Sequence, residues 1–255
     1  RLHGIKMNIR LLNDDMFNIL PKIEDKSVNM IFADFPYQTT NCSWDSLIDL
    51  ELFWKEADRI LKDNGLVVAT AQMPFTAVLA MSNIKDLRYE WIWEKTQATG
   101  HLNSKKMPMK SHESVLIYYK KLPTYNPQKT TGHKRKVSSA KNRAACIERR
   151  NNTDNIYGNE YSDKVGGYDS TERYPRDVIK FASDKQKTAL HKTQKPLALL
   201  EYLIKTYTNE GDLVLDPCFG SNTTGLACIN LNRNYIGIEK DTTFYEIGEK
   251  RIKHI

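Results

Sequence analysis

Hydrophobic positions along the chain alternate between short continuous runs and stretches with helical spacing. Residues 28–33 (VNMIFA) and 213–215 (LVL) are nearly unbroken apolar runs, which are typical of strands buried on both faces. From Leu50 to Leu61 the apolar residues recur every three or four positions, which predicts an amphipathic helix. Buried strands that alternate with amphipathic helices indicate an α/β fold with a mostly parallel sheet and helices on both faces.

Further runs extend this pattern toward both ends of the chain. Strands are predicted over residues 66–69, 89–93, 114–119 and 235–239, and helices over 196–207 and 224–231. The strands at 89–93 and 114–119 follow each other with no helix between them. They therefore predict a meander or an antiparallel hairpin at the edge of the sheet.

The middle of the chain has a different texture. Between residues 122 and 190, Pro, Asn, Ser, Thr, Lys and Gly dominate and apolar runs are few, which predicts a small irregular insertion. The remaining chain then forms two halves of one domain, residues 7–121 and 191–255. A length of 255 residues suits one α/β core with such an insertion.

Composition excludes several other classes of protein. No apolar run approaches the roughly 20 residues that cross a bilayer, and the first six residues lack the apolar core of a signal peptide. We therefore expect a cytoplasmic protein with no membrane partner. The four cysteines, Cys42, Cys146, Cys218 and Cys228, form no C-x-x-C pair, so we expect reduced thiols and no metal site.

Positive charge is concentrated in the predicted insertion. Residues 120–150 contain ten Lys and Arg and one acid, Glu148, which gives this stretch a formal net charge of +9. The whole chain has a formal net charge of +7, so the remaining residues sum to −2. Such a run is either a solvated basic loop or a surface that gains affinity for DNA by releasing condensed counterions. The residues expected to contact DNA are Lys134, Arg135, Lys136, Lys141 and Arg143.

Residues 213–225 combine a strand, a loop of small residues and the start of a helix. Such a loop lets a ligand approach the backbone closely at the carboxyl edge of a sheet, although it could also be a purely structural turn. It contains no G-x-G-x-x-G pattern and no Walker lysine, which argues against a dinucleotide or phosphate site. Glu239 ends the next strand 19 residues beyond Gly220, where a carboxylate could accept hydrogen bonds from a ribose.

A second candidate site is Asp34-Phe35-Pro36-Tyr37, directly after the strand at 28–33. Pro36 favours an extended Phe35, so that the Phe35 carbonyl and the Asp34 carboxylate can form a pair of acceptors. Two acceptors fit the two hydrogens of an amino group, and Tyr37 offers a flat face on which a base could stack. Taken alone, such a tetrapeptide is more often a turn that ends a strand than a catalytic site.

Together these motifs resemble a known family. Asp34-Phe35-Pro36-Tyr37 resembles the Asp-Pro-Pro-Tyr motif of amino-methylating DNA methyltransferases, and residues 216–225 resemble their Asp-Pro-Phe-x-Gly cofactor loop. Residues 191–196 (HKTQKP) resemble the His-Pro-Thr-Gln-Lys-Pro segment that precedes that loop. The order of the motifs resembles the beta group, which methylates adenine N6 or cytosine N4.

The resemblance implies a Rossmann-like fold, S-adenosylmethionine as cofactor and a flipped base in double-stranded DNA as substrate. Asp34 and the Phe35 carbonyl would accept from the target amino group, with Tyr37 stacked on the base; whether Asp34 also takes the proton is left open. The implied cofactor residues are Asp15, Thr193, Lys195, Asp216, Phe219, Gly220, Ser221, Asn222, Thr223 and Glu239. Asp14 is a near-equal alternative to Asp15.

The same resemblance implies that the insertion is a target-recognition region and that the protein is prokaryotic or phage-encoded. It allows a homodimer and a cognate restriction endonuclease that acts without direct binding. Adenine N6 is favoured because the cytosine enzymes more often carry Ser at the position of Asp34. Cytosine N4, an RNA or protein amino group, and a non-catalytic DNA-binding subunit are the alternatives. Two departures from the motifs are Phe35 for a proline and Asn222 for a glycine, which Asn can replace in a left-handed turn.

Overall fold

The computed structural model describes residues 7–36, 48–152, 167–183 and 194–253, which form two compact units. The larger unit is built from the chain up to Asn126 and again from Arg176 onward. The smaller unit is Pro127–Pro175, shorter at both ends than the predicted insertion at 122–190. None of the helices within the described ranges is long and apolar enough to cross a membrane.

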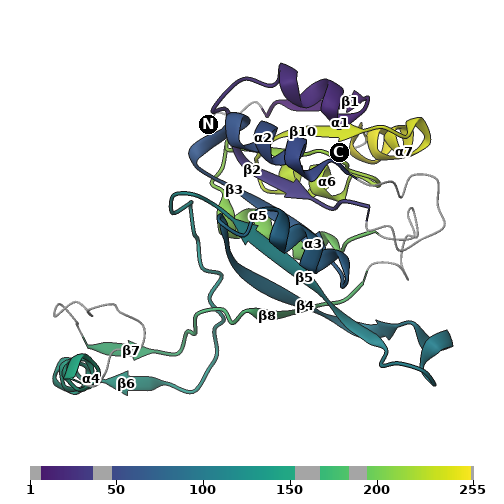
Figure 1. Cartoon of the computed structure of the whole chain (residues 1–255). Coiled ribbons are helices and arrows are strands. Elements are labelled where there is room, and N and C mark those ends of the chain that lie inside the picture. Colours follow the sequence, from purple (N-terminus) through teal and green to yellow (C-terminus); the bar gives the residue numbers. More distant parts are fainter. Residues whose placement is uncertain (1–6, 37–47, 153–166, 184–193, 254–255) are drawn as a thin grey trace. The chain divides into compact units, whose positions relative to one another are not determined.

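The larger unit is built on an eight-stranded sheet with the order β1-β10-β9-β2-β3-β5-β4-β8 (Figure 1). The strands are β1 (Ile9–Asn13), β2 (Val28–Ala33), β3 (Leu61–Ala71), β4 (Leu87–Thr99), β5 (Lys110–Tyr118), β8 (Val178–Phe181), β9 (Leu213–Asp216) and β10 (Asn234–Glu239). All pairings are parallel except those of β5 with β3 and β4. Every strand but β5 therefore points its carboxyl end to the same edge.

Helices cover both faces of this sheet. They are α1 (Met16–Ile19), α2 (Leu50–Ile60), α3 (Phe75–Ser82), α5 (Leu197–Tyr207), α6 (Thr223–Asn230) and α7 (Thr242–Lys253), with short 3-10 turns η1 (Leu20–Lys22) and η2 (His101–Asn103). Successive side chains of β2 point to opposite faces. Ile31 joins the core beneath α2 and α3, whereas Met30 and Phe32 join the core beneath α5 and α6. This confirms the predicted fold class.

The predicted antiparallel hairpin is formed by β4 and β5, and the structure adds a strand outside it. β8 pairs parallel with β4 from Ile92↔Val178 to Lys95↔Phe181. Four residues are too short a run for a periodicity to stand out, so β8 was missed within the predicted irregular insertion. β4 also continues past the sheet, pairing with β5 as far as Thr99↔Lys110.

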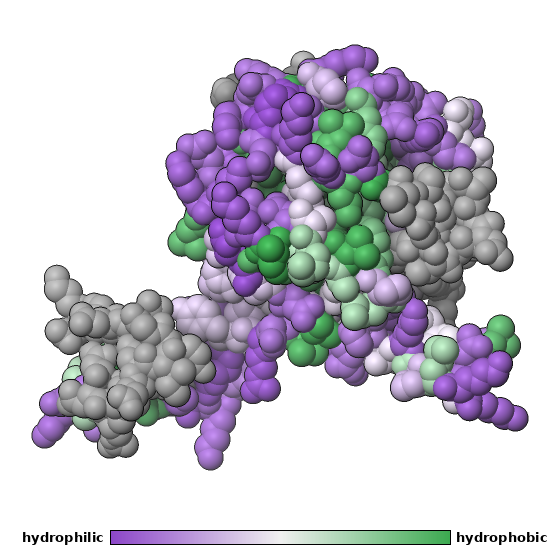
Figure 2. Space-filling view, in the orientation of Figure 1, coloured by the Kyte–Doolittle hydropathy of each residue, from purple (hydrophilic) through white to green (hydrophobic). Residues whose placement is uncertain are grey.

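We call residues 96–112 the arm, because this part of the β4–β5 hairpin leaves the sheet and is exposed throughout. Hydrophobic and hydrophilic residues lie side by side at its tip (Figure 2).

The smaller unit has secondary structure that its composition did not predict. β6 (Lys136–Ser138) pairs antiparallel with β7 (Tyr168–Ser170), and α4 spans Ala140–Asn152. The chain is secured within the larger unit just before this segment, since Asn126 N–H donates to Thr206 O at 2.7 Å and its side-chain amide donates to Thr208 O at 3.1 Å. After the segment, β8 secures the chain again by pairing with β4.

A cluster of buried charges lies where the arm leaves the sheet. Glu113 on β5 pairs through Oε1 with Lys95 Nζ on β4 at 2.6 Å and accepts from Gln72 Nε2 at 2.8 Å. Its Oε2 faces Lys195 Nζ at 3.3 Å, in an orientation that makes an ion pair without a hydrogen bond. The three charged side chains are only 6–8% exposed. Burial favours a raised pKa for Glu113, but Lys195 and Lys95 outweigh it and hold this pKa below its usual value.

Glu113→Gln should lower the free energy of unfolding by about 3–5 kcal/mol, because it leaves buried ammonium groups without their counter-charge. Urea unfolding at pH 7 measures the change. A carboxyl group with a lowered pKa stabilises the fold above its unfolded-state pKa, so the gap between wild type and variant should close as the pH falls through the acidic range.

The matched control is Glu94→Gln on β4, where an exposed ion pair links β4 to β8. Glu94 and Lys180 form an ion pair at 2.6 Å that is 43% and 59% exposed, so its loss should cost about 0–1 kcal/mol. Equal effects of the two substitutions would contradict a buried cluster.

Candidate active site

The carboxyl edge of the parallel strands gathers the side chains that the sequence singled out. Asp34 follows β2, Asp216 ends β9, Glu239 ends β10 and Asp15 follows β1. The four strands are neighbours in the order β1-β10-β9-β2, so residues from both ends of the chain meet at one edge. Open α/β sheets bind their ligands at this edge.

Asp34 is held by partners from two distant segments. Lys195 Nζ lies 2.7 Å from Oδ1 and 2.8 Å from Oδ2, and the Thr70 hydroxyl donates to Oδ1 at 2.5 Å. The Lys195 side chain is 6% exposed and that of Asp34 is 22% exposed. The carboxylate is thus fixed in orientation yet still reachable from solvent. Lys195, which was expected on the flank of a cofactor, thus also contacts Asp34.

Phe35 explains how this chain replaces the proline of the motif. Its side chain is 2% exposed and packs edge-on against Phe53, with ring centroids 4.9 Å apart. Anchoring in the core therefore restrains the backbone beside Asp34 in place of a proline ring. Tyr37, predicted to stack on a base, lies outside the described residues, as does Thr193.

The two candidate loops touch each other. Cys218 Sγ lies 3.4 Å from the backbone oxygen of Asp34, a contact between segments 184 residues apart. Burial raises the pKa of this thiol well above its usual value, so it stays protonated and can donate. A lone cysteine gives no signal in the sequence, and this contact was missed there.

The loop after β9 has the geometry that its small residues predicted. Gly220 and Asn222 both have positive φ, 53° and 58°, and Asn222 N–H donates to Phe219 O at 2.8 Å. Asn222 is fully buried and donates through its side-chain amide to Gly248 O at 3.1 Å. Asn therefore replaces the glycine of the motif both by tolerating the left-handed conformation and by tying the loop to α7.

Helix α7 packs against this loop. A Cβ at Gly248 would lie 2.5 Å from the Phe219 ring, so only glycine allows this approach. Arg251 donates to Ser221 O and to the Thr223 hydroxyl, each at 2.8 Å. Neither Gly248 nor Arg251 was predicted, since both act across 26 to 30 residues of chain.

Two acids next to this loop lie in a poorly solvated environment. Asp216 is 2% exposed, and burial raises its pKa to about 7 although Cys218 N–H donates to it at 3.0 Å. Glu239 accepts from Gly220 N–H at 2.8 Å and from Asp241 N–H at 2.9 Å, and burial raises its pKa as well. Buried carboxyl groups with raised pKa values suit a ligand that brings positive charge and hydrogen-bond donors.

Asp15 and Asp14 both serve local backbone contacts. Asp15 is the N-cap of α1, where it accepts from Phe17 N–H at 2.9 Å, and it pairs with Lys240 at 2.9 Å. Asp14 accepts from Asp15 N–H at 2.7 Å and from the Asn18 amide at 2.9 Å. Asp15 is thus the one of the two that faces the segment after β10.

The five residues predicted to contact DNA all lie in the smaller unit. Lys134, Lys136 and Lys141 are exposed, and Arg143 is half-buried. Arg135 is exposed but forms a bidentate pair with Asp169, at 2.8 and 2.5 Å. Its charge is therefore partly compensated within the unit.

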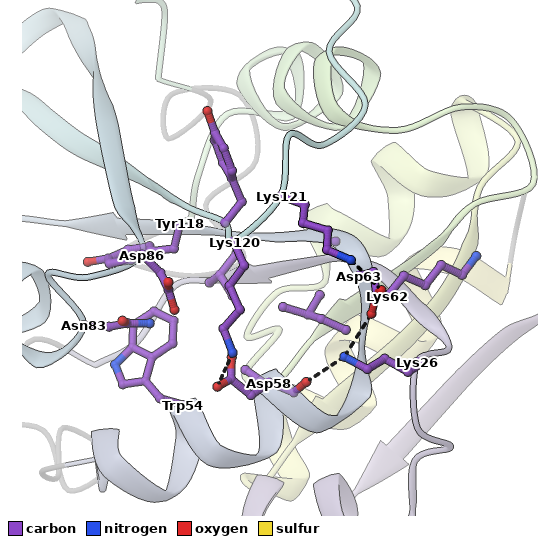
Figure 3. A pocket seen from close by; sticks show the side chains of 15 residues that line it. Lys26, Trp54, Asp58, Lys62, Asp63, Asn83, Asp86, Tyr118, Lys120 and Lys121 are labelled. Carbon is purple, nitrogen blue, oxygen red and sulfur yellow. Dashed lines mark hydrogen bonds and ion pairs between the residues drawn. The ribbon is translucent and has the colours of Figure 1, made fainter.

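A pocket at the opposite edge of the sheet contains none of the predicted site residues (Figure 3). Lys120 pairs there with Asp58 at 2.7 Å, and Lys121 and Lys26 pair with Asp63 at 2.8 and 3.5 Å. These lysines already have their counter-charges, and the pocket lies at the amino ends of the parallel strands. We therefore assign the candidate site to the carboxyl edge.

The chain is similar to known proteins over most of its length. The model of a DNA methylase family matches residues 28–250. The chain is 31% identical to the DNA adenine methyltransferase YhdJ of Escherichia coli (strain K12), over 95% of this chain and 82% of that protein.

Solved structures share the fold. The crystal structure of the M1.HpyAVI–SAM complex aligns with a TM-score of 0.63 at 24% identity, over 96% of this chain and 98% of that one. The PvuII cytosine-N4-specific DNA methyltransferase aligns with a TM-score of 0.64 at 15% identity, over 96% of this chain and 86% of that one. The resemblance drawn from the three motifs is confirmed by the family match over most of the sequence: the chain belongs to the DNA methylase family.

Proposed function

We propose that this protein transfers a methyl group from S-adenosylmethionine to the N6 amino group of adenine in double-stranded DNA. The observation that carries the proposal is the junction of the two loops at the carboxyl edge. There the Asp34 backbone oxygen lies 3.4 Å from Cys218, and the loop of Cys218 holds the buried Asp216 and the half-buried Glu239 nearby. An acceptor for an amino group thus adjoins a site suited to a positively charged ligand.

The cofactor fits the donors and acceptors present at this edge. S-adenosylmethionine supplies an electrophilic methyl group on a positively charged sulfur, and it carries an ammonium group and two ribose hydroxyls. Asp216 would accept from the ammonium group, Glu239 from the ribose hydroxyls and Asp15 from the adenine amino group. The loop residues Phe219, Gly220, Ser221, Asn222 and Thr223 would line the methionine end. Thr193 and Lys195 would flank it.

Asp34 acts on the target base. Its carboxylate and the Phe35 carbonyl accept hydrogen bonds from the amino group, which orients the nitrogen lone pair toward the methyl group. The carboxylate then stabilises the positive charge that develops on nitrogen, in an orientation fixed beforehand by Lys195 and Thr70. Tyr37 stacks on the base after it has left the helix.

Adenine is supported over cytosine by the relative at 31% identity, which is named a DNA adenine methyltransferase. The shared fold of a cytosine-N4-specific enzyme means that the sheet alone does not select the base. Asp34, where cytosine enzymes more often carry Ser, also favours adenine. The basic smaller unit supports DNA over a protein amide as substrate.

The partners and location follow from this activity. Double-stranded DNA is the substrate, read in part by the smaller unit as a target-recognition region. A homodimer, and a cognate restriction endonuclease that does not bind directly, are compatible with the proposal. The bacterial relatives support the cytoplasm as the site of action.

Incubation of the protein with DNA and S-adenosylmethionine should yield N6-methyladenine, and Asp34→Ala should lower the rate at least about 10³-fold. Nucleoside mass spectrometry identifies the base, and modification-aware sequencing gives the recognition sequence. Calorimetry should show that the variant still binds the cofactor. Detection of N4-methylcytosine instead would mean that cytosine, not adenine, is the target base. Near-normal turnover by Asp34→Ala would mean that Asp34 is not needed for catalysis.

Cofactor affinity should rise with pH, because Asp216 must lose a proton before it can accept from an ammonium group. With its pKa raised to about 7, the dissociation constant should tighten roughly eightfold between pH 6.0 and 7.5. Asp216→Asn should bind more weakly and remove most of this dependence, whereas Glu239→Gln should keep it. An affinity that is flat over this range in the wild type would place Asp216 outside the cofactor site.

Replacement of Lys134, Arg135 and Lys136 by Ala should weaken DNA binding and reduce its salt dependence. Each phosphate contact contributes about 0.9 to the slope of log K against log salt, so loss of two contacts lowers the slope by about 2. Arg135 should contribute least, because Asp169 already compensates its charge. Lys55→Ala/Lys85→Ala, which removes exposed lysines of the larger unit, is the control. An unchanged slope of log K against log salt in the triple variant would mean that this basic run does not contact DNA.

A further inference from the structure

The arm, residues 96–112, extends from the same edge of the sheet as Asp34. β4 runs parallel to β2 and β3, so its carboxyl end lies at the edge where Asp34 follows β2. The last row of paired residues that spans β3, β5 and β4 consists of Ala71, Ser114 and Ile92. From Ile92 to Thr99, β4 continues for roughly 20 Å at about 3.3 Å per residue. The arm therefore reaches well past the catalytic edge (Figure 1).

The charge of the arm has one sign. It contains Lys105, Lys106 and Lys110, and no Asp or Glu lies between Thr96 and His112. All three lysines are exposed, and no ion pair is found for them among the described residues. This surface is complementary to a polyanion such as the phosphate backbone of DNA.

The tip of the arm is apolar as well as basic. Leu102 is 87% exposed, and Met107 and Met109 are 54% and 41% exposed. Gly100, with φ of 90°, turns the chain into η2, which carries Leu102. Hydrophobic residues therefore gather beside hydrophilic ones at the end of the hairpin (Figure 2). Apolar side chains beside lysines are what proteins use to wedge into a base stack.

The base of the arm is rigidly joined to the catalytic carboxylate. Lys95 and Glu113, at the two ends of the arm, pair at 2.6 Å, and Glu113 lies 3.3 Å from Lys195, which holds Asp34. All three linking side chains are at most 8% exposed. The arm thus leaves the sheet at a fixed place relative to Asp34.

We propose that the arm is a second DNA-contacting element: its lysines bind phosphates beside the target, and Leu102 packs against the base stack next to the base that Asp34 receives. This inference rests on the proposed function, because it takes DNA as the substrate. The arm and the smaller unit then have different roles in DNA binding. The smaller unit binds along the duplex, and the arm compensates for the stacking lost when a base leaves the helix.

Two variants test the two halves of the proposal. Lys105→Ala/Lys106→Ala should lower the salt slope of binding to a labelled duplex by about 1.8. Leu102→Ala should lower the rate of duplex methylation by about tenfold. It should leave methylation of the same strand as single-stranded DNA unchanged, because there no base has to leave a duplex stack.

The controls match each variant in exposure and charge. Leu122, 77% exposed, lies just beyond β5 at the opposite edge, so Leu122→Ala should not distinguish duplex from single strand. Lys55→Ala/Lys85→Ala removes two charges and should leave the slope unchanged. Cofactor binding by calorimetry shows that each variant is folded.

The outcomes separate this proposal from the proposed function. Absence of methyl transfer by the wild type would overturn the function, whereas the salt slope still tests the arm. An unchanged slope in Lys105→Ala/Lys106→Ala, or equal loss of duplex and single-strand activity in Leu102→Ala, would overturn the arm as a DNA contact. A wild-type dimer that Leu102→Ala converts to a monomer, together with an unchanged salt slope in Lys105→Ala/Lys106→Ala, would overturn the proposal in favour of contact with a second copy of the chain.

Discussion

The ion pair between Lys195 and Asp34 is the contact on which the arrangement of the site depends. It joins residues 161 positions apart and so links the amino-terminal and carboxyl-terminal halves of the larger unit beside the candidate site. A lysine at 6% exposure would be costly if its charge were unmatched. Glu113 and Asp34 together supply the counter-charge, and Lys95 balances Glu113 in turn. Lys95, Glu113, Lys195 and Asp34 thus form a chain of four charges of alternating sign.

The loop after β9, proposed to bind the cofactor, depends on a different physical constraint, namely close packing of small residues. Gly248 lets the Phe219 ring approach α7, Asn222 occupies a left-handed turn, and Arg251 fixes the loop from the far side. The loop shape therefore depends in part on Gly248 and Arg251 of α7, which are not among the proposed ligand contacts. Both arrangements meet at Cys218, whose thiol lies against the Asp34 backbone.

The sequence predicted those features that repeat locally or match a motif. The strand before Asp34, the helix from Leu50 and the loop after Asp216 follow from spacing and small residues, and the structure contains them. Lys195 was found by motif, but its contact with Asp34 was not, because a partner 161 residues away leaves no local pattern. The short β8 and the helix α4 were missed for a related reason. Four residues of β8 and the weakly amphipathic, charged α4 depend on tertiary context that propensity does not contain.

The way Pro127–Pro175 is inserted has a consequence for how such proteins diversify. The chain is fastened to the larger unit at Asn126 before the segment and by β8 after it, so the sheet keeps its register whatever lies between. A segment bounded in this way can change length or sequence without disturbing the chemistry at the carboxyl edge. One segment of about fifty residues could then be exchanged between genes while the sheet and the residues at its carboxyl edge are inherited intact.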